Sequence, residues 1–96
     1  MQHHVIVKFN STVKDKKALA NEISVLFKGM EGMVKGVHKV TPHQNCINMS
    51  NRYDLMIIVD MDKDALEAYS NSPIHDKWIN EYPQYLESKV IMDYED

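Results

Sequence analysis

Apolar and polar residues alternate at the start of the chain, and this pattern predicts a β-strand from His3 to Phe9. The odd-numbered positions form one face of this strand, with residues His3, Val5, Val7 and Phe9. A second strand, from Tyr53 to Met61, shows the same alternation, but large aliphatic residues occur on both of its faces. Both segments are therefore expected inside a sheet, and the second is expected to be covered on two sides.

Helical spacing replaces alternation in two regions of the chain. From about Lys14 to Lys28 the apolar residues recur at helical intervals, at Leu19, Ile23, Leu26, Phe27 and Met30. The second region begins after Asp62, which is expected to cap a helix that contains Tyr69, and a further helical piece starts at Pro73. In that piece one stripe at i, i+3, i+4 and i+7 is predicted to point at the core, with residues His75, Trp78, Ile79 and Tyr82.

Two more strands complete the pattern. One is expected from Met33 to about Val40, ending before Pro42, which lacks the backbone donor that a sheet ladder uses. Residues 43–52 read as a loop. The last strand, Lys89 to Tyr94, is expected to place Val90, Met92 and Tyr94 on one face and Ile91 and Asp93 on the other.

The predicted order is strand, helix, strand, strand, helix, strand. This order favours a single α+β domain over residues 1–96, a ferredoxin-like βαββαβ sandwich with both helices on one face of an antiparallel sheet. The opposite face is expected to carry Ile6, Met56, Ile58 and Ile91. Burial of such a face at roughly 25 cal/mol per Å² would stabilise an association by many kcal/mol, and we therefore expect a homodimer packed sheet against sheet.

Charge and composition limit the kinds of partner and ligand that are expected. The net charge is −3, from 11 basic and 14 acidic residues, and the basic residues form no stripe, so a nucleic-acid partner is not expected. The one cysteine, Cys46, excludes an intramolecular disulfide, and no signal peptide or membrane span is evident, so we expect a cytoplasmic protein with no membrane partner. None of the five histidines has the spacing of a zinc site, and we expect no metal and no cofactor.

The candidate chemistry lies at Tyr69 and His75. A neutral imidazole can accept a proton from a carbon acid, and a phenol in a dry pocket can steady an enolate oxygen. The alternative is a core histidine with its hydrogen bonds satisfied and a tyrosine that is simply packed. His3 shares the expected pocket side, although a histidine near a chain start can also be exposed. The pocket wall is predicted to contain Val5, Phe27, Leu55, Trp78 and Tyr82, which could equally be plain core.

These residues also carry a family resemblance that extends over essentially the whole chain. The matching features are the strand His3 to Phe9, Gly36-Val37, the strand from Tyr53 into Asp62, the set Leu66, Tyr69, Pro73 and His75, and Asp93-Tyr94. In this order and spacing the chain resembles the stress-response dimeric α/β-barrel (Dabb) proteins.

The resemblance implies that two sheets pair into a barrel with the helices outside, and that each subunit holds a cavity between sheet and helices. In the related plant polyketide cyclases, a Tyr and a His at the positions of Tyr69 and His75 act as an acid–base pair in an aldol closure. Ser72 stands where the family usually has a histidine, and Leu55 where the plant cyclase has a pocket histidine.

Two classes of function stay open from the sequence. The first is a small cofactor-free enzyme of the lyase, cyclase or isomerase type, acting on a small carbonyl or aromatic compound. The second is a non-catalytic dimeric stress or ligand-binding protein. A third, an oxygen-dependent monooxygenase of the wider dimeric barrel class, has no residue in its favour.

Overall fold

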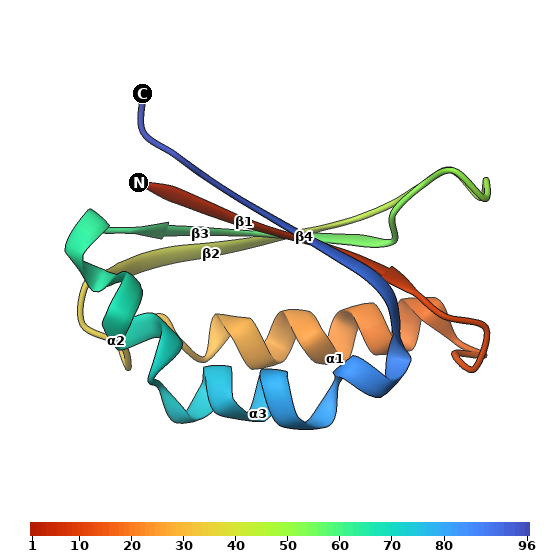
Figure 1. Ribbon diagram of the computed structural model, residues 1–96, viewed down its shortest axis with the longest axis horizontal. Helices are drawn as coiled ribbons and strands as arrows, with labels where there is room; N and C mark the ends of the chain where they lie inside the picture. The colour runs from red at the N-terminus through yellow and green to blue at the C-terminus, as the bar shows by residue number, and fades with distance from the viewer.

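The computed structural model describes all residues, 1–96, and consists of one sheet with helices on one side (Figure 1). The sheet is antiparallel in the order β2-β3-β1-β4, and its strands are β1 (Gln2–Phe9), β2 (Val37–Gln44), β3 (Leu55–Met61) and β4 (Leu86–Tyr94). The helices are α1 (Lys16–Lys28), α2 (Leu66–Ser70) and α3 (Pro73–Glu81), with short 3₁₀ turns at Lys63–Ala65 and Pro83–Tyr85. The ferredoxin-like α+β prediction is confirmed.

Strand β2 differs most from its prediction. It begins at Val37 instead of Met33, and it continues through Pro42 to Gln44, so the expected stop before the proline is wrong. The reason is its place in the sheet: β2 is an edge strand, and an edge strand tolerates a proline whose nitrogen faces solvent. The loop predicted over residues 43–52 therefore starts later, after Gln44.

The helix starts follow local capping chemistry. The Asp15 carboxylate accepts a hydrogen bond from the backbone N–H of Ala18 at 2.9 Å and begins α1, and Pro73 occupies the first turn of α3 as predicted. Asp62 does precede a helical turn, but its side chain makes no capping bond, and its Oδ1 instead contacts His38 Nε2 at 2.8 Å.

The core lies between the sheet and the helices. The side of the sheet that faces the helices is called the inner face, and the opposite side the outer face. Alternation in β1 and β3 is confirmed, because their inner residues are buried and their outer residues are half-exposed. Trp78 packs edge-to-face on Phe27, with ring centroids 5.1 Å apart, whereas Ile79 is 41% exposed and does not join the predicted stripe.

The faces of β4 correct one assignment. Directly opposed residues of an antiparallel pair share a face, and Ile91 pairs with Val5, which places Ile91 on the inner face and not on the outer face as predicted. Val90 pairs with Ile6 and so belongs to the outer face. The large aliphatic residues of the outer face are Ile6, Met56, Ile58, Val90 and Met92.

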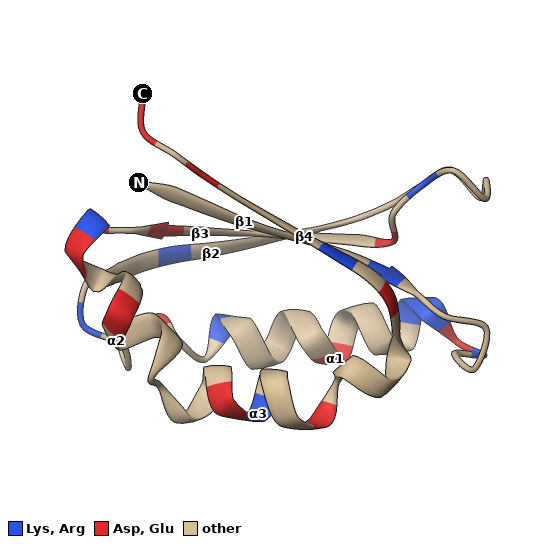
Figure 2. Ribbon diagram, in the orientation of Figure 1, with Lys and Arg blue, Asp and Glu red and all other residues tan.

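Charged residues of both signs occur on the helices, the strands and the loops (Figure 2). None of the helices has the length and apolar character needed to cross a bilayer.

Gly36, just before β2, is the most constrained glycine. Its φ is +89°, and an added Cβ would lie 2.6 Å from the Cβ of Ala65. We expect Gly36→Ala to lower the free energy of unfolding by about 2–4 kcal/mol, from the left-handed backbone cost together with the clash. Urea denaturation measures the loss.

The matched control is Gly32→Ala. Gly32 also has a positive φ, +78°, but its Cβ would meet open space, so we expect only the backbone cost of about 1 kcal/mol. Equal losses in the two variants would contradict the close approach of Gly36 to Ala65.

Candidate functional site

The structure brings three of the predicted site residues together. The rings of Tyr69 and His75 have centroids 4.9 Å apart, and the ring of His3 lies edge-on to Tyr69, also at 4.9 Å. Tyr69 comes from α2, His75 from α3 and His3 from the inner face of β1. His3 is 4% exposed, so the alternative of a frayed terminal histidine is wrong. With Asp93, described below, these residues form what we call the polar cluster.

Ser72 holds the turn between α2 and α3 in the shape that joins Tyr69 to His75. Its buried hydroxyl donates to the carbonyl of Tyr69 at 2.9 Å and accepts from the backbone N–H of His75 at 3.1 Å. The serine thus serves as the N-cap of α3, followed by Pro73. The sequence signal for this role is the Ser-Pro pair at the start of a helix.

Asp93 is the fourth member of the polar cluster, and it was not among the predicted site residues. It lies directly opposite His3 in the β1–β4 register, and its Oδ1 contacts His3 Nδ1. Because an ionised carboxylate only accepts, His3 Nδ1 carries the proton in this contact. The pair therefore fixes the orientation of the His3 ring.

The Tyr69 hydroxyl is buried without a hydrogen-bond partner in the chain. The residue is 1% exposed, and its Oη is the one buried side-chain polar atom left unsatisfied. Burial, and then the nearby charge of Asp93, raises the pKa of Tyr69 above its usual value, so the hydroxyl stays protonated and is a donor. A buried polar group without a partner lowers the free energy of unfolding by about 1–3 kcal/mol. The stability of the fold therefore does not explain why this hydroxyl is present.

His75 is half-buried at the start of α3. Burial lowers its pKa, and the positive charge of Lys89 on β4 and the neighbouring His3 lower it further. The ring is therefore neutral near pH 7 and has a nitrogen able to accept a proton. A neutral acceptor thus stands beside a protonated donor, which is the arrangement that acid–base chemistry on a carbonyl compound requires.

The remaining predicted site residues belong to the core. Val5 is buried two positions from His3 on the same face of β1, and Leu55 pairs with Val7, toward the opposite end of the sheet. Trp78 contacts Phe27 and also Tyr82, whose ring centroid is 5.6 Å away. Whether these side chains line a pocket stays a prediction.

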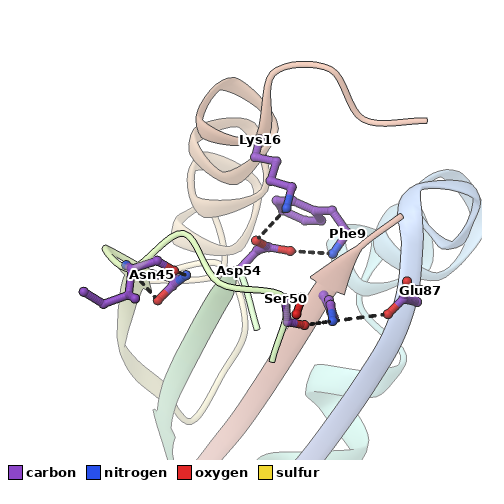
Figure 3. A network of polar contacts seen from close by, with 8 residues as sticks. Phe9, Lys16, Asn45, Ser50, Asp54 and Glu87 are labelled. Carbon is purple, nitrogen blue, oxygen red and sulfur yellow. Dashed lines mark hydrogen bonds and ion pairs between the residues drawn. The ribbon is translucent and has the colours of Figure 1, made fainter. Parts of the chain in front are cut away.

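The main surface hollows lie elsewhere. The largest, about 350 Å³, lies between the start of α1 and the β2–β3 loop, with the exposed thiol of Cys46 in its wall. Figure 3 shows the polar contacts next to it: Asp54 accepts from the N–H of Phe9 at 2.8 Å and pairs with Lys16 at 3.4 Å. None of the four main hollows has a residue of the polar cluster in its wall. No group of three His, Cys, Asp or Glu residues is placed to hold a metal ion.

Comparisons with known proteins agree on the family and the fold. A family model described as Stress responsive A/B Barrel Domain (Dabb) matches residues 1–96. A dimeric protein of unknown function and ferredoxin-like fold from Bacteroides fragilis is 18% identical, with a TM-score of 0.83 over 99% of this chain and 94% of that one. A dimeric ferredoxin-like protein of unknown function from Thermobifida fusca is 16% identical, with a TM-score of 0.80 over 97% and 87%.

The hydroxynitrile lyase of Passiflora edulis has a similar fold. It is 11% identical, with a TM-score of 0.76 over 97% of this chain and 89% of the lyase. The search of curated proteins finds no match.

Proposed function

The chain belongs to the stress responsive A/B barrel domain family, and from that premise we propose that it forms a homodimer whose polar clusters perform cofactor-free acid–base chemistry on a small carbonyl compound. The single observation that carries the chemical part is the buried, protonated and unpartnered hydroxyl of Tyr69 beside the neutral ring of His75.

The outer face of the sheet supports the homodimer. Its aliphatic residues come from three strands, and Val90 and Met92 are 45% and 60% exposed in the single chain. A group of exposed aliphatic residues on a sheet face is typical of an interaction surface. The similar structures from Bacteroides fragilis and Thermobifida fusca are both described as dimeric.

The proposed chemistry assigns one role to each ring. A carbonyl oxygen accepts the hydrogen bond of the Tyr69 hydroxyl, and His75 takes a proton from the carbon next to that carbonyl. The electron pair of the broken bond moves onto the carbonyl oxygen, where the Tyr69 hydroxyl stabilises the negative charge that develops. The His3–Asp93 pair keeps the wall of the site in place. The hydroxynitrile lyase with a similar fold supports a lyase-type reaction.

Solvent deuterium exchange tests this function without knowledge of the natural substrate. Phenylacetone, benzoylacetone and 4-oxo-4-phenylbutanoate are incubated with protein in D₂O, and loss of the α-proton signal is followed by NMR. We expect wild type to accelerate exchange of at least one compound and His75→Gln to lower the rate by about 100-fold or more.

His38→Gln provides the matched control, since His38 is an exposed histidine at the other edge of the sheet, paired with Asp62. This variant is expected to exchange at the wild-type rate. Absence of wild-type exchange with every compound, or equal rates in wild type and His75→Gln, would refute the catalytic proposal.

The pH profile gives a second measurement. The proton acceptor is the neutral form of His75, so the exchange rate is expected to fall as the pH is lowered through the pKa of that ring. Because burial and Lys89 lower this pKa, the midpoint should lie below 6.5, and the rate should be level around pH 7. A midpoint above 6.5 would contradict the assignment of His75 as the base.

A ligand-binding protein without turnover is the second candidate. It rests on the same unpartnered Tyr69 hydroxyl, which would donate a hydrogen bond to a bound carbonyl compound without any proton transfer to His75. Binding of a carbonyl compound that is lost in His75→Gln, with no exchange by wild type, would support this candidate over the enzyme.

A further inference from the structure

The inner face of β4 is only partly covered by the helices. The register pairs Lys89 with Val7, Ile91 with Val5, and Asp93 with His3, so all three β4 side chains belong to the face that bears the polar cluster. Ile91 is nevertheless 50% exposed, whereas its partner Val5 is 2% exposed. Figure 1 shows β4 rising away from the helices toward the C-terminus, and the inner face of this strand is therefore exposed at Ile91, next to the polar cluster.

Lys89 is the cation of this open side. It stands in an apolar stretch of β4, before Val90, and it takes part in none of the six ion pairs of the chain. Its positive charge lowers the pKa of His75. A lysine held unpaired beside a histidine is therefore available to an anion from outside the chain.

The other charged residues around His75 cannot take the role of Lys89 as the partner of an anion. Asp93 is occupied by His3, and Asp76 is exposed on α3, with a smaller effect on His75 than that of Lys89. Asp93 and Lys89 lie four residues apart on this face, about 13 Å along the strand, with Asp93 opposite His3 and Lys89 opposite Val7. Of these two charges, Lys89 is the one that lowers the pKa of His75. A substrate lying along this strand meets a hydrogen-bond donor, a base and a cation.

We propose that Lys89 makes the site selective for oxo acids, in which the carboxylate lies beyond the carbon that loses its proton. The carbonyl oxygen contacts the Tyr69 hydroxyl, the α-carbon lies at His75, and the carboxylate pairs with the Lys89 ammonium. The exposed side of Ile91 provides an apolar surface for the body of the substrate. This inference rests on the proposed function, because it specifies the substrate class of the same site.

A pair of probes that differ in one charge tests the proposal. 4-Oxo-4-phenylbutanoate and its methyl ester share the ketone, the ring and the exchangeable α-protons. The dissociation constants of both probes are measured by ligand-observed NMR, and their deuterium exchange rates are measured in D₂O. Both measurements are made on wild type, Lys89→Met and Lys89→Arg. Lys77→Met, which removes an exposed lysine from α3, is the matched control.

We expect wild type to bind the acid about fivefold more tightly than the ester at low ionic strength, and the preference to shrink with added salt. Lys89→Met should lose this preference while its affinity for the ester is unchanged, and Lys89→Arg and Lys77→Met should keep it. A merely structural role of Lys89 would weaken both probes equally and would show no salt dependence.

Three results would overturn the proposal: equal affinities of wild type for acid and ester, equal losses for both probes in Lys89→Met, or no binding of either probe at millimolar concentration. Failure of the proposed function has a different signature. If acid selectivity is present and depends on Lys89 but no exchange occurs, the carboxylate site stands and the catalytic assignment of His75 fails.

Discussion

A lysine in place of Ile58 is expected to dissociate the dimer. Ile58 lies on the outer face of β3, an inner strand of the sheet, opposite His4 of β1 and Thr41 of the edge strand β2. In the proposed dimer the new ammonium would be buried against apolar side chains without a partner, at a cost of several kcal/mol. Every 1.4 kcal/mol is tenfold in affinity, so the dissociation constant should rise by about 1,000-fold or more.

Light scattering coupled to size-exclusion chromatography measures the effect. Wild type should elute with twice the chain mass of 11.2 kDa, and Ile58→Lys with the chain mass itself. Val25→Lys is the matched control, because Val25 is 73% exposed on α1, on the helical side of the molecule, and this variant should stay dimeric. Wild type at 11.2 kDa, or a dimeric Ile58→Lys, would contradict sheet-to-sheet pairing.

The outer face could be predicted from the sequence in part. Alternation gives an unambiguous parity in β1 and β3, because polar residues such as Lys8 and Asp60 mark one side. In β4 the run Val90-Ile91-Met92 is apolar at every position, so its parity depends on the pairing with β1, which the pattern does not contain. The misplacement of Ile91 follows from this, and its correction adds Val90 and Met92 to the face.

The polar cluster could likewise be predicted from the sequence only in part. Tyr69, Ser72 and His75 are close in sequence, so helix and turn signals were enough to place the two rings together. Asp93 and Lys89 reach the site from the other end of the chain, through the antiparallel pairing of β1 and β4. Only the register shows that these two side chains face the histidines, and so the charges that surround the base were beyond sequence reasoning.

Tyr69→Phe is expected to stabilise the fold and to remove the proposed activity. The substitution deletes a buried hydroxyl that has no partner in the chain and leaves the ring contacts with His3 and His75 in place. Loss of an unsatisfied buried polar group should raise the free energy of unfolding by about 1 kcal/mol. The same deletion takes away the donor to the carbonyl oxygen, so deuterium exchange should fall by about 100-fold or more. Urea denaturation and the NMR exchange assay measure the two effects on one sample.

Tyr85→Phe is the matched control for this pair of measurements. Tyr85 is half-buried and packs on Tyr82, outside the polar cluster, and its hydroxyl is not left buried and unsatisfied. This variant should exchange at the wild-type rate and should gain no stability. A Tyr69→Phe protein that is less stable than wild type would show that the hydroxyl is hydrogen-bonded in the folded protein and serves the structure. A gain in stability together with a loss of exchange would support a functional role of the hydroxyl, because a residue kept for packing alone has no reason to retain a hydroxyl that weakens the fold.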